Sequence, residues 1–292
     1  SLIELFQNEK MKNKTLSFIL LASLTFSCRN AGNEVRNQTP SDQDVIKITA
    51  FKSPGNNYIL EQGAIIRGDT TIRNLALVFT GDEFADGAEY IAATLNENGI
   101  NASFFLTGNY YRNKKFTEAL KKLHKNGNYL GAHSDRHLLY CDWVKRDSLL
   151  VTRQDFLDDL ENNYTEMKKL GIKKEEALFF LPPYEWYNDS ISKWTGEAGL
   201  RLINFSPGTR SNADYTYPDM GEKYVDSKTI HESILNYEKE SSNGLNGFIL
   251  LVHIGTHPGR TDKYYHFLPD LIKELKSRGY NFVRIDDLLS LH

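Results

Sequence analysis

Two histidines four residues apart, His133 and His137, are the side chains in this sequence best suited to binding a metal ion. Two adjacent acids, Asp82 and Glu83, follow one apolar run of the chain, and His253 follows another. Two imidazoles and one carboxylate form a common site for Zn²⁺ and related divalent ions, with one position left open for water. His253, on a different strand end, fits a general acid.

Each of these residues also has a simpler explanation. Histidines at this spacing are often structural, and Asp82 or Glu83 could cap a helix or lie in solvent. His253 could be a core histidine that is hydrogen-bonded to the backbone. The metal hypothesis therefore depends on whether the surrounding elements bring these side chains to one place.

Short apolar runs alternate with helical patterns along most of the chain. The runs predict strands at 75–79, 102–106, 129–132, 178–181, 200–204, 248–252 and 281–283. The patterns predict helices at 86–98, 114–126, 152–170, 189–198, 230–240, 268–277 and 285–291. This alternation favours parallel pairing of buried strands, and about seven strand–helix units are enough to close a barrel. We therefore expect an α/β fold, a distorted (β/α) barrel of the TIM-barrel type.

In such barrels the chemistry lies at the carboxyl ends of the strands. The polar residues singled out above follow predicted strands, as do a Pro-Pro-Tyr sequence ending at Tyr184 and a long loop that contains Asp214. We expect all of them at one mouth of the barrel.

The beginning of the chain is typical of an export signal. Met11 and a basic start precede an apolar run at 16–26, and Cys28 follows a small residue. This run is shorter than the ~20 residues that a membrane-spanning helix needs. The pattern resembles a bacterial lipoprotein signal. Within residues 1–28 we therefore expect 1–10 to lie upstream of the signal, residues 11–28 to direct export, and Cys28 to carry a lipid.

The expected domain organisation follows from composition. Residues 29–44 are polar and predict a flexible tether, whereas residues 45–292 predict the barrel domain. We therefore expect a protein in the periplasm or at the cell surface, anchored to a bacterial membrane through its lipid.

Charge and cysteine content limit the partners. The formal net charge is −3 and basic residues are interspersed with acidic ones, which does not favour nucleic-acid binding. Two cysteines exclude a disulfide framework, and Cys141 is expected to be a buried free thiol. Nothing in the sequence implies a protein partner.

The order and spacing of these motifs resemble the polysaccharide deacetylases of carbohydrate esterase family 4, over roughly residues 63–290. The His-Ser-x-x-His motif is intact at 133–137, and the late Leu-x-His motif is intact at 251–253. The family's Asp-Asp pair would directly follow Phe79, but Thr80 and Gly81 stand there and the acids come two residues later. The arginine of the Arg-x-Pro-Tyr motif is absent, because Leu181 occupies its position.

The resemblance implies a divalent metal ion, usually zinc, held by one aspartate and two histidines. It assigns His133 and His137 as ligands, Asp82 as the third ligand and Glu83 as the base that takes a proton from water; the reverse assignment of the two acids remains open. It also implies that His253 is the general acid.

Other implied roles concern the oxyanion and the substrate. Tyr184 would lie on the oxyanion side, and Asp214 is the nearest candidate for the family's Asp/Trp motif. Trp186 and Tyr187 could stack on a sugar ring or pack beneath their loop.

The resemblance thus predicts a hydrolase that removes N- or O-linked acetyl groups from a carbohydrate, by means of water activated on a metal ion. The altered acids and the absent arginine leave two alternatives open. One is a catalytically impaired carbohydrate-binding lipoprotein on the same fold, and the other is a metal-dependent amide or ester hydrolase of a non-glycan substrate.

Overall fold

The structure, a computed structural model, describes residues 57–289. The expected export signal with Cys28, the expected tether at 29–44 and residues 290–291 of the last expected helix lie outside this range. No helix within 57–289 is both long and apolar enough to cross a membrane.

A single curled sheet of nine strands forms the centre of the molecule. Its strands are β1 (Ile59–Glu61), β2 (Ala64–Arg67), β3 (Asn74–Gly81), β4 (Ser103–Leu106), β5 (Tyr129–Ala132), β6 (Phe179–Phe180), β7 (Arg201–Leu202), β8 (Phe248–His253) and β9 (Asn281–Phe282). Strands β3 to β7 lie side by side in chain order, β8 lies on the other side of β3, and all of these pairs are parallel. The predicted parallel sheet is confirmed.

The barrel closes through a strand that the sequence did not reveal. Strand β2 pairs antiparallel with β8, and Ile65 of β2 bridges Ile203, just beyond β7. The predicted seventh strand, β9, is only two residues long and pairs only with the first residues of β3. The place between β8 and the end of β7 is occupied by β2 of the β1–β2 hairpin, which the sequence analysis did not predict.

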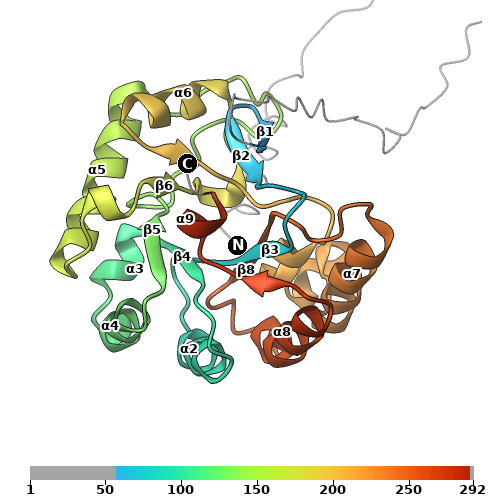
Figure 1. Cartoon of the computed structure of the whole chain (residues 1–292). Coiled ribbons are helices and arrows are strands. Elements are labelled where there is room, and N and C mark those ends of the chain that lie inside the picture. Colours follow the sequence, from blue (N-terminus) through green and yellow to red (C-terminus); the bar gives the residue numbers. More distant parts are fainter. Residues whose placement is uncertain (1–56, 290–292) are drawn as a thin grey trace, which may run out of the picture. The chain divides into compact units, whose positions relative to one another are not determined.

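Helices surround the sheet, as Figure 1 shows. The α-helices are α2 (Ala88–Glu97), α3 (Gly108–Arg112), α4 (Thr117–Lys125), α5 (Arg153–Lys169), α6 (Asp189–Glu197), α7 (Ser227–Glu240), α8 (Leu268–Ser277) and α9 (Ile285–Leu288). Short 3₁₀ helices include η1 (Lys114–Phe116), η3 (Pro183–Glu185) and η4 (Ser211–Tyr215). The helix expected at 114–126 is divided into η1 and α4, and α3 was not predicted.

Local sequence signals explain where the longest helix begins. Thr152 precedes α5, and its side chain accepts a hydrogen bond from the backbone N–H of Asp155. In return, the backbone N–H of Thr152 donates to the Asp155 side chain. This capping box satisfies N–H groups that the helix itself leaves free. The helix is therefore fixed at its amino end, and the residues along it are placed against the sheet.

The core explains why the strands are continuous apolar runs. Strand β3 is buried from Leu75 to Gly81, because the sheet lies between its barrel interior and the outer helices. The rings of Phe79 and Phe104 stack with centroids 4.9 Å apart. Cys141 is buried and free of any disulfide within the described residues, as expected.

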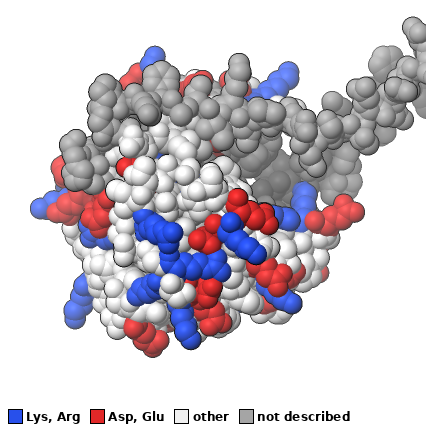
Figure 2. Space-filling model, turned by 45° about the vertical axis from the view of Figure 1, so that its right-hand side comes forward, with Lys and Arg blue, Asp and Glu red and all other residues white. Residues whose placement is uncertain are grey.

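Charged side chains of both signs are distributed over the surface. On the face in Figure 2, Lys and Arg lie among Asp and Glu. That arrangement matches the mixed charge pattern of the sequence.

Candidate active site

The side chains singled out from the sequence meet at the carboxyl ends of the parallel strands. The ring centroids of His133 and His137 are 5.2 Å apart, and the ring of Tyr184 lies 4.3 Å from that of His137. The charges of Asp82 and His253 both act on the pKa of His137. One mouth of the barrel therefore holds residues that follow β3, β5, β6 and β8.

The two histidines do not lie on a helix. Residues 133–139 form a loop after β5, with left-handed backbone at Ser134 (φ 76°) and at His137 (φ 55°). The two rings meet because these two left-handed conformations turn the loop back on itself. Such backbone in residues other than glycine costs energy and is common at functional sites.

Helix α5 holds this loop in place through Asp159, a residue that the sequence analysis missed. Asp159 is buried and accepts hydrogen bonds from Ser134 Oγ (2.6 Å), Asp135 N (3.2 Å), Arg136 N (3.2 Å) and Tyr140 Oη (2.8 Å). One turn further on, Asn163 accepts a hydrogen bond from the His133 N–H at 2.8 Å. In the sequence, Asp159 and Asn163 could have been recognised as a pair of polar residues four apart on a helix face that is otherwise apolar.

Both histidines are in the form that a metal ion requires. Burial lowers the pKa of His133 well below its usual value, and burial lowers the pKa of His137 to about 4. The Nδ1 of His133 lies 2.8 Å from the Leu181 carbonyl oxygen, which can only accept, so Nδ1 carries the proton and Nε2 is free to bind. As neutral imidazoles, the two rings are suitable ligands for a divalent cation.

The third expected ligand is not assembled with them. The Oδ1 of Asp82 accepts hydrogen bonds from Thr107 Oγ1 (2.7 Å) and Asn109 Nδ2 (3.3 Å), both at the start of α3. Within residues 57–289, no three His, Cys, Asp or Glu side chains lie close enough to hold a metal ion together. Asp82 would have to turn away from Thr107 to join the histidines.

The remaining acid of the pair lies differently. Glu83 is exposed, and its side chain makes no hydrogen bond or ion pair with any residue between 57 and 289. The two adjacent acids thus diverge, with Asp82 turned toward the mouth and Glu83 toward solvent.

The backbone explains why no acid directly follows Thr80. A Cβ atom at Gly81 would lie 2.5 Å from Ile254 Cγ2 and 2.9 Å from Leu106 Cδ2. A side chain at this position would require the neighbouring strand ends to move. Thr80 itself is buried, and its hydroxyl has no partner within the described residues.

His253 is held by Asp214, the residue expected to replace the family's Asp/Trp motif. The Nδ1 of His253 lies 2.6 Å from Asp214 Oδ1, and its backbone N–H donates to Asp214 Oδ2 at 2.9 Å. Burial by itself lowers the pKa of His253, but the charge and hydrogen bond of Asp214 outweigh it, so this pKa is raised. Asp214, contributed by η4, orients the histidine in this structure.

A second carboxylate near His253 was missed in the sequence. Tyr184 (φ 61°) and Glu185 (φ 53°) are consecutive left-handed residues in η3. Burial raises the pKa of Glu185 to about 7, against the opposing influence of His253. A carboxyl group with a pKa near neutrality can both accept and donate protons in that range.

The two aromatic residues after it lie differently from one another. Tyr187 is fully buried and donates its hydroxyl to the Glu61 carbonyl oxygen at 3.0 Å, so its ring packs beneath the loop. Trp186 is partly exposed, and its Nε1–H donates to the Asp142 carbonyl oxygen at 3.3 Å.

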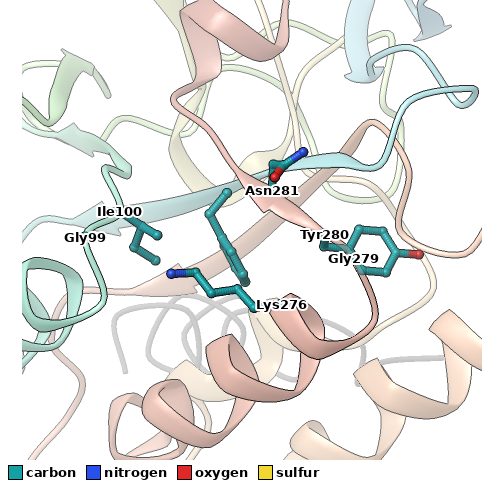
Figure 3. Close-up of a pocket in the computed structure, with 7 residues that line it drawn as sticks. Gly99, Ile100, Lys276, Gly279, Tyr280 and Asn281 are labelled. Carbon is teal, nitrogen blue, oxygen red and sulfur yellow. The ribbon is translucent and has the colours of Figure 1, made fainter.

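A separate hollow of about 380 Å³ lies away from this mouth. Figure 3 shows that its lining comes from the end of α8, β9 and the turn before β4, and Lys276 is its one ionisable side chain apart from Tyr280. Asn281 in its lining pairs with Asn74, at the amino end of β3. The hollow therefore has no part in the chemistry of the strand carboxyl ends.

Comparison with known proteins agrees with this geometry. Residues 67–203 match the model of the polysaccharide deacetylase family. A peptidoglycan-N-acetylglucosamine deacetylase of Bacillus cereus is 27% identical over 196 residues, which cover 67% of this chain and 78% of that protein.

Solved structures share the fold. The structure of PdaA from Bacillus subtilis, a family 4 carbohydrate esterase, has a TM-score of 0.61 at 22% identity and covers 78% of this chain and 85% of its own. A family 4 pseudoenzyme from Bacillus anthracis has a TM-score of 0.58 at 19% identity and covers 79% of this chain and 70% of its own. The family match runs from the last residue of β2 through β7 and ends before β8. Over residues 67–203 the chain therefore carries a polysaccharide deacetylase domain.

Proposed function

We propose that this protein removes acetyl groups, N- or O-linked, from a carbohydrate polymer or oligosaccharide. The observation that carries the proposal is the meeting of two neutral histidines and a paired histidine, His253, at one mouth of the barrel. The relatives named as peptidoglycan deacetylases make an acetylated bacterial glycan the first substrate to test.

A divalent metal ion, with zinc the first candidate, belongs to the proposal. The two neutral rings of His133 and His137 would hold it. Among the carboxylates, Asp82 has the largest effect on the pKa of His137. When bound, such an ion polarises a carbonyl group and lowers the pKa of water to ~7. The buried loop and Asp159 keep the two rings oriented before any ligand arrives.

His253 supplies the proton for the leaving group in this proposal. Because the Asp214 carboxylate can only accept, it fixes the His253 proton on Nδ1 and leaves Nε2 toward the mouth. The raised pKa keeps a larger share of His253 protonated near neutral pH. The positive ring can then donate the Nε2 proton to the amine or alcohol that leaves.

Three carboxylates are candidates for the base that takes the proton from water: Asp82, Glu83 and Glu185. Glu83 is exposed and Asp82 faces the mouth, so the contacts favour Asp82 of this pair. Glu185 adds a third candidate, since burial gives its carboxyl group a pKa of about 7 next to His253. A base with a pKa near the working pH is the most effective.

A second candidate function rests on the residues that are missing. Thr80 and Gly81 stand where the family has its acids, and Leu181 stands where it has its arginine. A structure with the same fold is described as a pseudoenzyme. The second candidate is therefore a catalytically impaired carbohydrate-binding protein.

Export and lipid anchoring through Cys28 remain part of the proposal. Two relatives are named for peptidoglycan, which lies outside the cytoplasm, and this supports a place in the periplasm or at the cell surface. Nucleic acid has no place in the proposal, and the partners are the glycan and the membrane.

One experiment separates the two candidates. Acetate release is measured with a panel of acetylated glycans and non-glycan amides, and binding of each glycan is titrated by calorimetry in parallel. Release from a glycan supports the deacetylase. Binding without release supports the impaired protein, and release only from non-glycan amides supports the third possibility raised by the sequence.

A further inference from the structure

A small hairpin beside the mouth of the barrel presents a tryptophan to solvent. After the histidine loop, Cys141 bridges Leu149 in antiparallel fashion, and the Asp142 N–H donates to the Ser148 carbonyl oxygen at 2.9 Å. Trp143 lies in the turn of this hairpin and is 41% exposed.

The turn is held in one conformation. The Oδ1 of Asp142 accepts hydrogen bonds from the N–H groups of Val144 and Lys145, both at 2.8 Å. At the base of the hairpin, the Tyr140 hydroxyl donates to Asp159, the same carboxylate that holds the histidine loop. Because the turn is already ordered, it loses little conformational entropy when a ligand binds, and this favours binding.

The Trp143 ring is supported from beneath. It stacks on the ring of Trp186 with centroids 5.5 Å apart and planes at 29°, and the Arg146 guanidinium lies 4.2 Å from the centre of the Trp186 ring. Arg146 is fixed by hydrogen bonds to the Tyr187 carbonyl oxygen (2.6 Å) and to Glu61 (3.2 Å). The three groups form a rigid stack.

This stack is continuous with the candidate metal site. The ring of Tyr184 meets Trp143 edge to face at 5.6 Å and meets His137 at 4.3 Å. On the His253 side of the mouth, Tyr215 is 46% exposed and lies 5.7 Å from the His253 ring. One exposed ring, Tyr215, therefore lies next to His253, and another, Trp143, is connected to His137 through Tyr184.

We propose that Trp143 stacks on the pyranose ring of a sugar next to the acetylated one, so that the substrate is a glycan of at least two units. This rests on the proposed function. An exposed, preorganised aromatic ring that adjoins a catalytic site marks a ligand contact, and its flat face matches the apolar face of a sugar ring. A single tryptophan is too small for a stable protein interface, which needs about 1,000 Å².

Three variants test the inference. Trp143→Ala removes the platform, Trp143→Phe keeps a flat ring, and Val144→Ala changes a neighbour in the same turn that is 91% exposed. Kinetics are measured with an N-acetylated oligosaccharide series and with the N-acetylated monosaccharide, and oligosaccharide binding is titrated by calorimetry.

For Trp143→Ala we expect KM for oligosaccharides to rise about two- to twelvefold, because aromatic stacking of this kind contributes ~0.5–1.5 kcal/mol beyond area burial. We expect kcat to stay within about twofold and the monosaccharide to be unaffected. Trp143→Phe should keep most of the affinity, and Val144→Ala should behave as the parent protein.

The outcomes separate this inference from the proposed function. If the parent protein releases no acetate but its oligosaccharide affinity falls in Trp143→Ala, the platform is supported and the deacetylase proposal fails. If acetate is released and Trp143→Ala leaves oligosaccharide KM and affinity unchanged, the platform is overturned and the deacetylase stands. A change only in self-association, measured by light scattering, would also overturn it.

Discussion

Replacing Asp214 with asparagine tests how the mouth controls proton donation. The substitution keeps the shape of the side chain but removes its charge. Asp214 now accepts two hydrogen bonds from His253, one from the ring and one from the backbone N–H. Asparagine has one oxygen, so its NH₂ group must face one of these two donors, and the ring proton loses its fixed place on Nδ1.

The magnitude follows from these contacts. A hydrogen bond to a charged group contributes about 1.5–3 kcal/mol, against about 1 kcal/mol for a neutral one. The substitution therefore removes ~1–2 kcal/mol of stabilisation of the protonated ring, which lowers the His253 pKa by about one unit. A pKa lower by one unit reduces the protonated share of His253 by up to about tenfold above that pKa, and the loss of the fixed Nδ1 proton lowers the rate further, so we expect kcat to fall at least about tenfold near neutral pH.

The direction of the pH effect is also fixed. Activity requires protonated His253, and Asp214 holds its pKa above the usual value, so the rate should fall as pH rises through that raised pKa. In Asp214→Asn this alkaline limb should move to lower pH.

The assay is the pH profile of acetate release, with Asp219→Asn as the matched control. Asp219 lies in the same segment, is exposed, and loses the same charge on substitution. Thermal melting verifies that both variants are folded. A folded Asp214→Asn protein with kcat within about twofold of the parent and an unmoved alkaline limb would refute the assignment of His253 as the acid.

Three further results are expected from the same loops. Asp82→Asn should lose most acetate release whereas Glu83→Gln should lose little, since only Asp82 faces the mouth; equal losses in steady-state kinetics would contradict this. Glu185→Gln should remove any rise in rate near pH 7, because a base must be deprotonated to act and burial gives this carboxyl a pKa of about 7; an unchanged pH profile would exclude it as the base. Asp159→Ala should lower the free energy of unfolding by about 3 kcal/mol, because it leaves several buried donors unpaired; urea denaturation measures this, and a change below 1 kcal/mol would show that water replaces the carboxylate.

Strand and helix patterns predicted most of the fold because each buried strand is a continuous apolar run. The strand at 129–132 was found to the residue, whereas the strand expected at 75–79 lies within the longer β3, which continues through Thr80 and Gly81. The β1–β2 hairpin was missed because its strands are short and irregular, and its closing role depends on a distant contact between Ile65 and Ile203. Contacts between residues far apart in the sequence leave no local pattern.

The site was predictable where residue type alone carries the chemistry. His133, His137 and His253 stood out as histidines at strand ends, and they lie together at the mouth. Asp159 acts from the middle of a helix, where an acid looks like any solvated residue. Glu185 gains its properties from burial in a left-handed turn, which the sequence does not display.

The central claim is that this mouth hydrolyses acetyl groups with a metal ion held by the two histidines of one loop. The most direct test is acetate release from an N-acetylated glycan by the parent protein and by His137→Ala, before chelation, after chelation and after zinc is restored, with bound metal measured throughout. We predict release that is lost on chelation and regained with zinc in the parent protein, and weak zinc binding without release in His137→Ala. Full release by protein shown to be free of metal, or by His137→Ala, would contradict the account.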